Sequence, residues 1–323
     1  MFLCLGSILS FAQRRESNQY FQYKLKEVAR LKEYEWDNRL EYLRNTRDLY
    51  YNDDYLSFLV NSVWKISKPV HIVDYGCGYG YLGLKLLPLL PIGSRYTGID
   101  KGKKLINEAR ELFRSLPYKV EFIEADVAEF EMESTYDIAV CHAFLLHMND
   151  PKTILQKMID SVVNGGNIIC FEPHWISNMS SYYLNNLEQS EMIQLGVLQK
   201  LFEKDEKRHG KDGNIGIKLP VYLSELGVEN IECRVSDKVN FVNGHEDQRE
   251  KQQLYHSLKE EGIGNTPAEK KEFIERLVNR GLAYNEAMAQ YEAELQLSKE
   301  FTMDSSLVYA PSMKITFGIV KSK

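Results

Sequence analysis

Short apolar runs alternate with longer amphipathic stretches through the middle of the chain. Runs rich in apolar, β-branched and aromatic residues recur at 70–75, 95–99, 119–123, 136–141 and 167–171, and apolar residues three or four apart follow several of them. Apolar runs of this length are typical of strands buried on both faces, and the stretches between them are typical of the helices that cover such strands. The pattern therefore predicts an α/β fold with a doubly wound, largely parallel sheet.

The parts of the chain on either side of this alternating core carry a different, helical pattern. Residues 17–66 show apolar stripes at helical spacing, and Asn52 is placed to cap a helix that begins at Asp53. Residues 236–312 also show helical stripes, and they separate two further strands expected at 231–235 and 313–320. We expect this insertion to form a helical cap.

A run of glycines follows the first strand. The strand ends in Asp74, and Gly76, Gly78 and Gly80 come directly after it. Glycine lets a backbone turn tightly and lets a ligand approach closely, because it has no Cβ. A helical pattern begins at once and stops before Pro88. Strand, glycine turn and helix together predict a corner that binds a nucleotide-like ligand.

Two classes of ligand suit this corner. Residues 78–83 match the G-x-G-x-x-G pattern, in which a pyrophosphate binds at a helix N-terminus. The longer string, Asp74-x-Gly76-x-Gly78-x-Gly80, resembles motif I of class I S-adenosylmethionine (SAM)-dependent methyltransferases. A carboxylate at Asp74 repels a pyrophosphate but suits a ligand that carries an ammonium and a sulfonium. We therefore favour SAM. An NAD(P)-dependent Rossmann oxidoreductase and a SAM-binding protein without catalysis remain as alternatives.

The resemblance covers residues 70–235 and the last strand, and it implies both a fold and an activity. The implied fold is a mostly parallel, seven-stranded Rossmann-like sheet with an antiparallel last strand. The implied activity is transfer of a methyl group from SAM to an O, N, S or C atom of a small-molecule acceptor. The long insertion departs from the family pattern and leaves the acceptor unidentified. The expected domains are an N-terminal helical segment (1–66), the methyltransferase core (67–235 and 313–323) and the cap (236–312).

The cofactor residues are expected at the strand ends. Asp100 closes the second strand, and its carboxylate offers two oxygens to a pair of ribose hydroxyls. In the family that the chain resembles, an acidic residue after the third strand often accepts the adenine amino group, which points to Asp126, and His142 after the fourth strand is expected beside the cofactor. The full expected set is Asp74, Gly76, Cys77, Gly78, Gly80, Asp100, Lys101, Asp126, Val127 and His142.

Candidates for the acceptor side come from two strand ends. Glu172 and His174 follow the fifth strand, and a carboxylate near the histidine is expected to raise the imidazole pKa and suit it to act as a base. His147 is a second candidate base. The alternative for each of these side chains is a structural hydrogen bond.

Two aromatic residues are candidates for substrate contact. Trp175 comes just after the fifth strand. Tyr51 lies in the helical segment before motif I, which in many methyltransferases of this type closes over the cofactor. Its alternative role is that of an aromatic anchor between two helices.

Composition narrows the possible partners. The chain has 323 residues, a formal net charge of −6 and no long cluster of basic residues, so we expect no nucleic-acid partner. Its five cysteines lack metal-site or disulfide spacing, and we expect them in the core of a protein from a reducing compartment, with no metal. Residues 1–12 are apolar but lack a leading positive segment and are too short to span a bilayer. We therefore expect a cytoplasmic protein, as a monomer or a homodimer.

Overall fold

The computed structural model describes residues 35–131, 135–244 and 247–321. The chain divides into two compact units, 1–40 and 41–323. In the first unit only a 3-10 helix, η1 (Glu35–Asn38), and the start of the next helix are described. The apolar segment at 1–12 and the helical stripes before residue 35 lie outside the described residues. In the described part of the chain no helix is long and apolar enough to cross a membrane.

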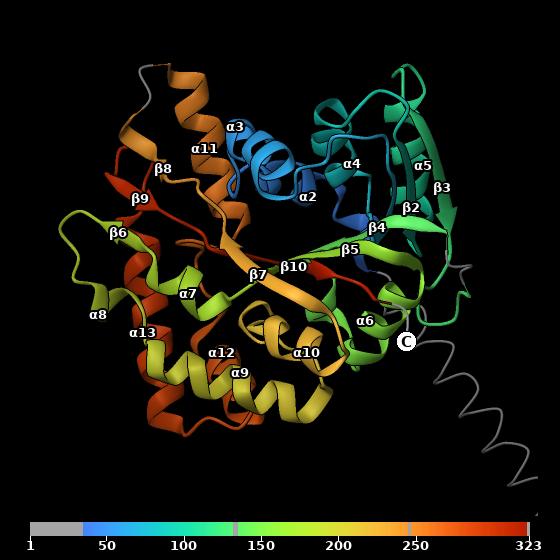
Figure 1. Cartoon of the computed structure of the whole chain (residues 1–323). Coiled ribbons are helices and arrows are strands. Elements are labelled where there is room, and N and C mark those ends of the chain that lie inside the picture. Colours follow the sequence, from blue (N-terminus) through green and yellow to red (C-terminus); the bar gives the residue numbers. More distant parts are fainter. Residues whose placement is uncertain (1–34, 132–134, 245–246, 322–323) are drawn as a thin grey trace, which may run out of the picture. The chain divides into compact units, whose positions relative to one another are not determined.

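The second unit is built around a seven-stranded sheet (Figure 1). Its strands run parallel except for β10, which is antiparallel to both of its neighbours. The predicted sheet with an antiparallel last strand is confirmed. The strands, in spatial order, are β3 (Lys119–Glu124), β2 (Arg95–Asp100), β1 (His71–Tyr75), β4 (Tyr136–His142), β5 (Val162–Pro173), β10 (Met313–Ile319) and β7 (Glu229–Val235).

Helices cover both faces of this sheet, as the alternating pattern predicts (Figure 1). On one face the strands pack against α6 and α10 in a single apolar core. On the other face Trp64 packs edge-on against Phe171 and Phe317. The first face carries α6 (Pro151–Asp160), η5 (Ile215–Ile217) and α10 (Leu219–Glu225), and the second carries α3 (Asp53–Phe58), η2 (Leu59–Val63), α4 (Tyr81–Leu86), η3 (Leu87–Leu89) and α5 (Lys103–Phe113).

The fifth strand begins earlier than the apolar run indicates. The sequence Asn164-Gly165-Gly166 is typical of the end of a helix, but α6 ends at Asp160 and these residues lie inside β5. Opposite β4, Tyr136 pairs with Val162 and Ile138 pairs with Asn167, so the strand contains an irregularity. A Cβ at Gly166 would lie 2.5 Å from the carbonyl oxygen of Asp137. The glycines therefore permit an irregular strand rather than terminate a helix.

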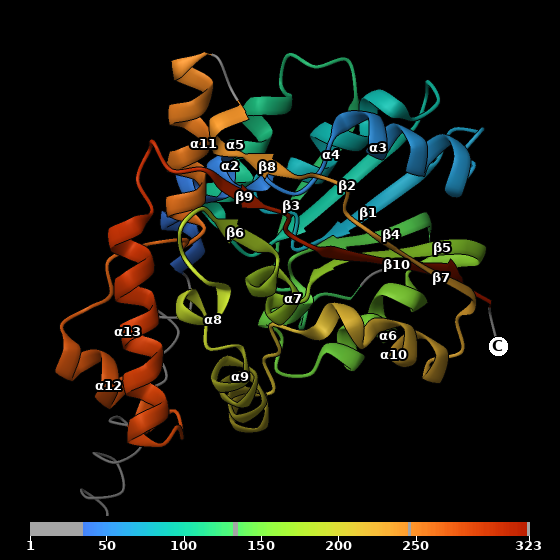
Figure 2. The ribbon, with the colours of Figure 1, turned by 90° about the vertical axis from the view of Figure 1, so that its left-hand side faces the viewer.

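The insertion contains strands as well as the predicted helices (Figure 2). Two of its strands join a third, from before β7, in a small antiparallel sheet of order β6-β9-β8. Helix α13 also contacts α8 and α9, which precede β7 in the chain. The elements of this region are α7 (Trp175–Ser180), β6 (Tyr182–Leu184), α8 (Gln189–Met192), α9 (Leu195–His209), β8 (Asn240–Phe241), η6 (Val242–Gly244), α11 (Gln248–Glu260), α12 (Lys270–Asn279), α13 (Tyr284–Glu300) and β9 (Leu307–Tyr309).

Four cysteines fall within the described residues, and all four are free thiols. Cys77, Cys141 and Cys170 are buried in or beside strands of the main sheet, as expected from the sequence. Cys233 lies on the edge strand β7 and is exposed, so the expectation of a core position is wrong for this residue.

The insertion holds the loop between α2 (Leu40–Arg47) and α3 by hydrogen bonds to its peptide groups. Asp237 accepts from the backbone and side-chain nitrogens of Asn52 at 3.1 and 2.7 Å. The amide of Asn240, which is 4% exposed, donates to the carbonyl oxygens of Leu49 and Tyr309 at 2.9 and 3.2 Å. Although Asn52 does precede a helix as predicted, its side chain binds the insertion instead of capping the helix.

We call residues 48–52 the clamped loop. Glu261 of the insertion adds a further contact to this loop, because its carboxylate accepts from the hydroxyl of Tyr50, and it also accepts from that of Tyr42 on α2 at 3.4 Å. The insertion therefore fixes the segment that leads into α3.

Replacing Asn240 with Ala tests this attachment. The substitution leaves two carbonyl oxygens without their donor in a buried place, and we expect it to lower the free energy of unfolding by about 1–3 kcal/mol. Chemical denaturation followed by circular dichroism measures the change. Asn243→Ala is the matched control, since Asn243 is exposed and lies three positions later in the same segment. Equal effects of the two substitutions would contradict the proposed importance of the buried amide.

Candidate active site

A pocket opens at the carboxyl ends of β1 and β4, where the glycine turn was predicted to bind a ligand. Its volume is about 300 Å³, including space open to solvent. Helix α2 contributes one wall, and the glycine turn with the start of α4 contributes another. The lining residues are Leu43, Arg47, Asp74, Gly76, Cys77, Gly78, Tyr79, Tyr81, Leu82 and His142.

The glycine turn has the backbone conformation that only glycine adopts readily. Gly76 and Gly78 have φ angles of +72° and +54°. A Cβ at Gly76 would also lie 2.1 Å from the ring of Phe144. At Gly78 the nearest atom to a Cβ would be in Leu43, at 4.0 Å, so this glycine faces the pocket. The turn thus presents bare backbone to a ligand.

Asp100 holds the glycine turn in place from the end of β2. One carboxylate oxygen accepts from the backbone nitrogen of Gly78 at 2.9 Å, and the other accepts from that of Gly102 at 2.7 Å. Asp100 does not line the pocket itself, but the turn that it orders does. The predicted cofactor ligand is therefore also a structural part of the motif.

Asp74 places a buried carboxyl group in the pocket wall. The side chain is 1% exposed, and one oxygen accepts from the hydroxyl of Tyr96 at 2.5 Å. The other oxygen, Oδ1, is buried and has no hydrogen-bond partner. Burial raises the pKa of Asp74 to about 7, against the hydrogen bond from Tyr96, which acts to lower it. An unsatisfied buried oxygen in a pocket wall is suited to a ligand that carries a hydrogen-bond donor.

Arg47 is a pocket residue that the sequence did not reveal. Its guanidinium has no carboxylate partner within 4.0 Å among residues 35–131, 135–244 and 247–321, although its charge acts on several neighbouring side chains. The hydroxyl of Tyr81 donates to its backbone oxygen at 3.2 Å, which joins the end of α2 to α4. Arg47 follows Leu43 by four positions, so both lie on one helix face. That spacing was the available signal.

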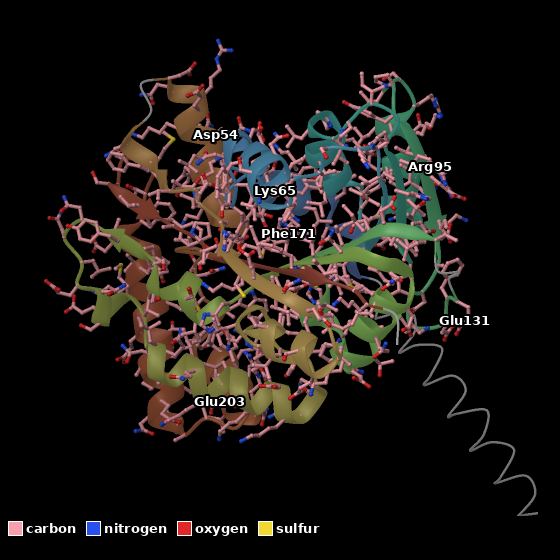
Figure 3. All side chains as sticks on the ribbon, viewed as in Figure 1. Asp54, Lys65, Arg95, Glu131, Phe171 and Glu203 are labelled. Carbon is pink, nitrogen blue, oxygen red and sulfur yellow. The ribbon has the colours of Figure 1, made fainter. Side chains whose placement is uncertain are left out.

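Tyr51 and His142 form a buried pair beside the pocket. The Tyr51 hydroxyl lies 3.1 Å from Nε2 of His142, and the two rings are 5.7 Å apart. Burial, aided by the charge of Arg47, holds the pKa of His142 well below its usual value, so the imidazole is neutral at physiological pH. His142 lines the pocket, whereas Tyr51 reaches it only through this pair. Phe171, labelled in Figure 3, packs edge-on against Tyr51.

Four further predicted cofactor residues lie outside the pocket lining. Lys101 and Asp126 face each other at 3.6 Å, each with 41% of its side chain exposed. Val127 beside them is buried in the core. Gly80, with its left-handed φ of +84°, begins helix α4, and its Cβ position is occupied by the rings of Phe113 and Phe122. None of these four residues lines the pocket.

Glu172 has a structural task in the fold. The side chain is fully buried, and its carboxylate accepts from the backbone nitrogens of Phe144, Leu145 and Leu146 at 2.9, 2.8 and 3.4 Å. It therefore holds the turn after β4 that carries His142. Burial raises the pKa of Glu172 to about 7, and the three backbone donors oppose that shift.

The expected pairing of Glu172 with His174 is wrong in its electrostatics. The pKa of His174 is lowered, by burial first and then by Lys314, and the carboxylate that acts on it is Asp212. Neither Glu172 nor His174 lines the pocket. Strand alternation explains the position of Glu172 alone: Phe171 lies beside the pocket residue His142, and Glu172, the next residue, points to the opposite face of the sheet.

The remaining two acceptor-side candidates also lie apart from the pocket. Trp175 packs against Gly213 and Phe202, with 38% of its surface exposed. His147 ends the short helix η4 (Leu145–His147). The structure thus brings together Asp74, Gly76, Cys77, Gly78 and His142, with Tyr51 attached, and leaves Trp175 and His147 elsewhere.

Parts of this chain are similar to known proteins. Among curated proteins, the ubiquinone biosynthesis O-methyltransferase of Colwellia psychrerythraea is 29% identical over 128 residues, which are 39% of this chain and 50% of that protein. The malonyl-[acyl-carrier protein] O-methyltransferase of Acetivibrio thermocellus is 35% identical over 95 residues, which are 29% of this chain and 32% of that protein. The chain therefore spans half or less of the length of these relatives.

Among solved structures, phosphoethanolamine N-methyltransferase 2 of Haemonchus contortus, in complex with phosphomonomethylethanolamine and S-adenosylhomocysteine, has a TM-score of 0.47 at 13% identity. The match covers 90% of this chain and 60% of that one.

A family model described as a methyltransferase domain matches residues 66–262, which is more than half of the chain. The match contains the glycine turn, Asp100 and His142, and it extends through β7 and the whole of α11. The resemblance drawn from motif I is confirmed, and the chain belongs to the methyltransferase-domain family of class I SAM-dependent enzymes.

Proposed function

We propose that this protein transfers a methyl group from SAM to a small-molecule acceptor and that the pocket beside the glycine turn holds the methionine part of SAM. The observation that carries the proposal is the pairing of opposite charges across the pocket. Asp74 offers a buried carboxylate oxygen without a partner, and Arg47 offers a guanidinium without a carboxylate within 4.0 Å in the described part of the chain. An amino acid carries one ammonium and one carboxylate, so it complements both groups.

The adenosine part is assigned to the strand ends beyond the pocket. Asp100 closes β2, as expected for a ribose ligand, and Asp126 with Val127 follows β3, where the sequence places the adenine site. In this assignment the Asp100 carboxylate accepts hydrogen bonds from the ribose hydroxyls. They either replace a bond from a backbone nitrogen or add to it, since the two oxygens hold four lone pairs. A dinucleotide fits less well, because its pyrophosphate would face the carboxylate of Asp74. The proposed setting is cytoplasmic.

SAM supplies an already activated methyl group, so the protein's task is alignment, exclusion of water and acceptance of a proton. Helix α2 closes one side of the pocket with Leu43 and Arg47, and Leu43 lies over Gly78. His142 is neutral and is the one described histidine that lines the pocket, which makes it the best placed of them to take a proton from the acceptor. Tyr51 fixes the ring by its hydrogen bond. His147 and His174 remain candidate bases of lower geometric support.

Ligand-induced stabilisation tests the cofactor assignment. We expect S-adenosylhomocysteine to raise the melting temperature, because a ligand that binds only the folded state stabilises it by about 2.7 kcal/mol at one hundred times Kd. NAD and NADP are expected to have no effect. Arg47→Met should weaken S-adenosylhomocysteine binding by about 1.5–3 kcal/mol through loss of a charge-assisted hydrogen bond. Arg39→Met is the control. Stabilisation by NAD alone would overturn the assignment.

The pH dependence of binding tests the role of Asp74. With a pKa of about 7, its carboxyl group is protonated below pH 7 in the free protein. A ligand ammonium at Oδ1 favours the carboxylate, so binding lowers this pKa and releases a proton. We expect affinity for S-adenosylhomocysteine to rise with pH up to about 7, by at most about tenfold per pH unit. Calorimetry in two buffers of different ionisation enthalpy measures the released proton.

Asp74→Asn keeps the shape of the side chain and removes the titration. This variant should bind more weakly and show no proton release, whereas the exposed Glu129→Gln should behave as the unchanged protein does. Proton release that persists in Asp74→Asn would assign the titration to another group.

A third test concerns Tyr51 and His142. We expect His142→Gln to lower methyl transfer about 10²–10⁴-fold, the usual contribution of a general base. Tyr51→Phe should lower it less, because this substitution removes the hydrogen bond that orients the His142 ring but keeps the imidazole itself. The measurement is transfer of label from methyl-tritiated SAM into a metabolite extract, with S-adenosylhomocysteine affinity measured separately. Tyr55→Phe, in the neighbouring helix, is the matched control.

The same assay separates the alternative bases. If His174→Ala or His147→Ala abolishes transfer while His142→Gln leaves it intact, the assignment of the base to His142 is wrong. If none of the three substitutions matters, alignment alone governs the reaction.

A further inference from the structure

Lys314 is a half-buried lysine without a carboxylate partner. It stands near the start of β10, and its ammonium contacts the hydroxyl of Ser312 and lies 3.5 Å from that of Ser177 on α7. Across residues 35–131, 135–244 and 247–321, no carboxylate oxygen lies within 4.0 Å of it. Burial lowers the pKa of Lys314, and no acidic group raises it. A cation is thus partly withdrawn from water without an ion pair, although Glu172 is its cross-strand neighbour.

Lys218, nearby in the same layer, shows how the chain treats a comparable lysine. With 33% of its side chain exposed, Lys218 makes ion pairs with Glu206 at 2.6 Å and with Asp212 at 2.8 Å. The hydrogen bonds and charges of these two carboxylates raise its pKa against the effect of burial. The charge of Lys218 is therefore neutralised by two carboxylates, whereas the hydrogen bonds of the Lys314 ammonium go to two hydroxyl groups.

The groups around Lys314 are suited to bind an oxyanion. The Ser177 and Ser312 hydroxyls accept from Lys314, and no hydrogen bond among the described residues uses their own protons. His174 lies within the electrostatic reach of Lys314, which lowers its pKa. We call Lys314, His174, Ser177 and Ser312 the Lys314 cluster. An ammonium, two hydroxyl protons and an imidazole come together there from two segments of the chain, the start of α7 and the start of β10.

The cluster is held in place by a buried side chain. Asn178 is 5% exposed, and its side-chain oxygen accepts from the backbone nitrogen of Ser312 at 2.8 Å. This bond ties α7 to the residues that enter β10, and so fixes the two hydroxyls relative to each other. A preorganised group of donors loses little entropy when a ligand binds.

The position of the cluster relates it to the cofactor pocket. Ligands of open α/β sheets bind beyond the carboxyl ends of the strands, and α7 lies at that end of β5. His142 pairs with Phe171, and Phe171 pairs with Ile315, the neighbour of Lys314. Two strand spacings, about 10 Å, therefore separate the backbone positions of His142 and Lys314. The Lys314 side chain points from β10 toward the face of the sheet that carries α10. Its ammonium nevertheless lies 3.5 Å from the hydroxyl of Ser177, on the helix that follows the carboxyl end of β5.

We propose that the Lys314 cluster binds the anionic end of the methyl acceptor, a carboxylate or phosphate group carried by a small molecule that extends about 10 Å from the methylated atom. This proposal rests on the proposed methyltransferase function. It assigns the acceptor to the class of small organic oxyanions, which neither motif I nor the pocket identifies.

Inorganic phosphate is the probe for the cluster itself. We expect phosphate, but not chloride at matched ionic strength, to shift the imidazole NMR resonance of His174 in a saturable way. His174→Gln assigns that resonance by its disappearance. Lys314→Met should weaken the response at least tenfold, Lys314→Arg should retain it, and Lys152→Met is the control, since Lys152 is exposed and paired with Glu225. No saturable shift, or an unchanged shift in Lys314→Met, would refute the anion site.

A second measurement separates failure of this proposal from failure of the proposed function. Labelled products from the metabolite extract are divided by anion exchange into anionic and other fractions. We expect the label in the anionic fraction, with a loss of at least tenfold in Lys314→Met and unchanged S-adenosylhomocysteine affinity. Label confined to neutral or cationic products overturns the acceptor class and leaves the methyltransferase standing. Absence of S-adenosylhomocysteine binding overturns the function, and the acceptor proposal with it, while the phosphate response reports on the anion site alone.

Discussion

The hydrogen bonds that hold the clamped loop connect the insertion to the pocket. Asp237 and Asn240 bind peptide groups of this loop from one side. Arg47, just before the loop, lines the pocket, and Tyr51 within it bonds to His142 on the other side. Peptide groups that are bound at both ends of a segment leave little freedom to the side chains between them. The insertion, which its helical pattern predicts to be a cap, therefore also fixes the segment that follows the pocket residue Arg47.

Two buried carboxylates, Asp74 and Glu172, illustrate how similar side chains can serve either ligand binding or the stability of the fold. Glu172 has three backbone donors, so its charge is compensated inside the protein. Asp74 has one donor and one bare oxygen. Both have a pKa near 7 for the same reason, burial, yet only Asp74 has capacity left for another molecule. The two roles differ in whether each carboxylate oxygen already has a hydrogen-bond donor within the protein, and not in the size of the pKa shift.

Much of the fold was predictable because its signals are local. The apolar runs identified five strands, and the spacing of Asp74 and its glycines identified the turn and the ligand class. The strand β5 was misjudged at its start because glycines within an irregular strand resemble a helix terminator. The small strands β6, β8 and β9 escaped notice, since two or three residues carry no measurable period.

The site was only partly predictable, for a different reason. His142 and Tyr51 were recognised by position, but their hydrogen bond joins residues 91 positions apart. Arg47 was missed because a single arginine on a helix does not indicate a binding site until the structure shows which residues lie across the pocket from it. Glu172 and His174 were judged from strand-end position, whereas the face on which a side chain emerges decides whether it meets the pocket.

The place of β10 in the main sheet has a consequence for synthesis of the protein. This strand lies between β5 and β7, yet it is translated after the entire insertion. While the ribosome makes residues 236–312, β7 has no partner in the main sheet and one edge of β5 is bare. Unpaired strand edges invite association with other chains. The growing chain thus depends on late closure by a single strand, and a pause in translation within the insertion would prolong its most aggregation-prone state.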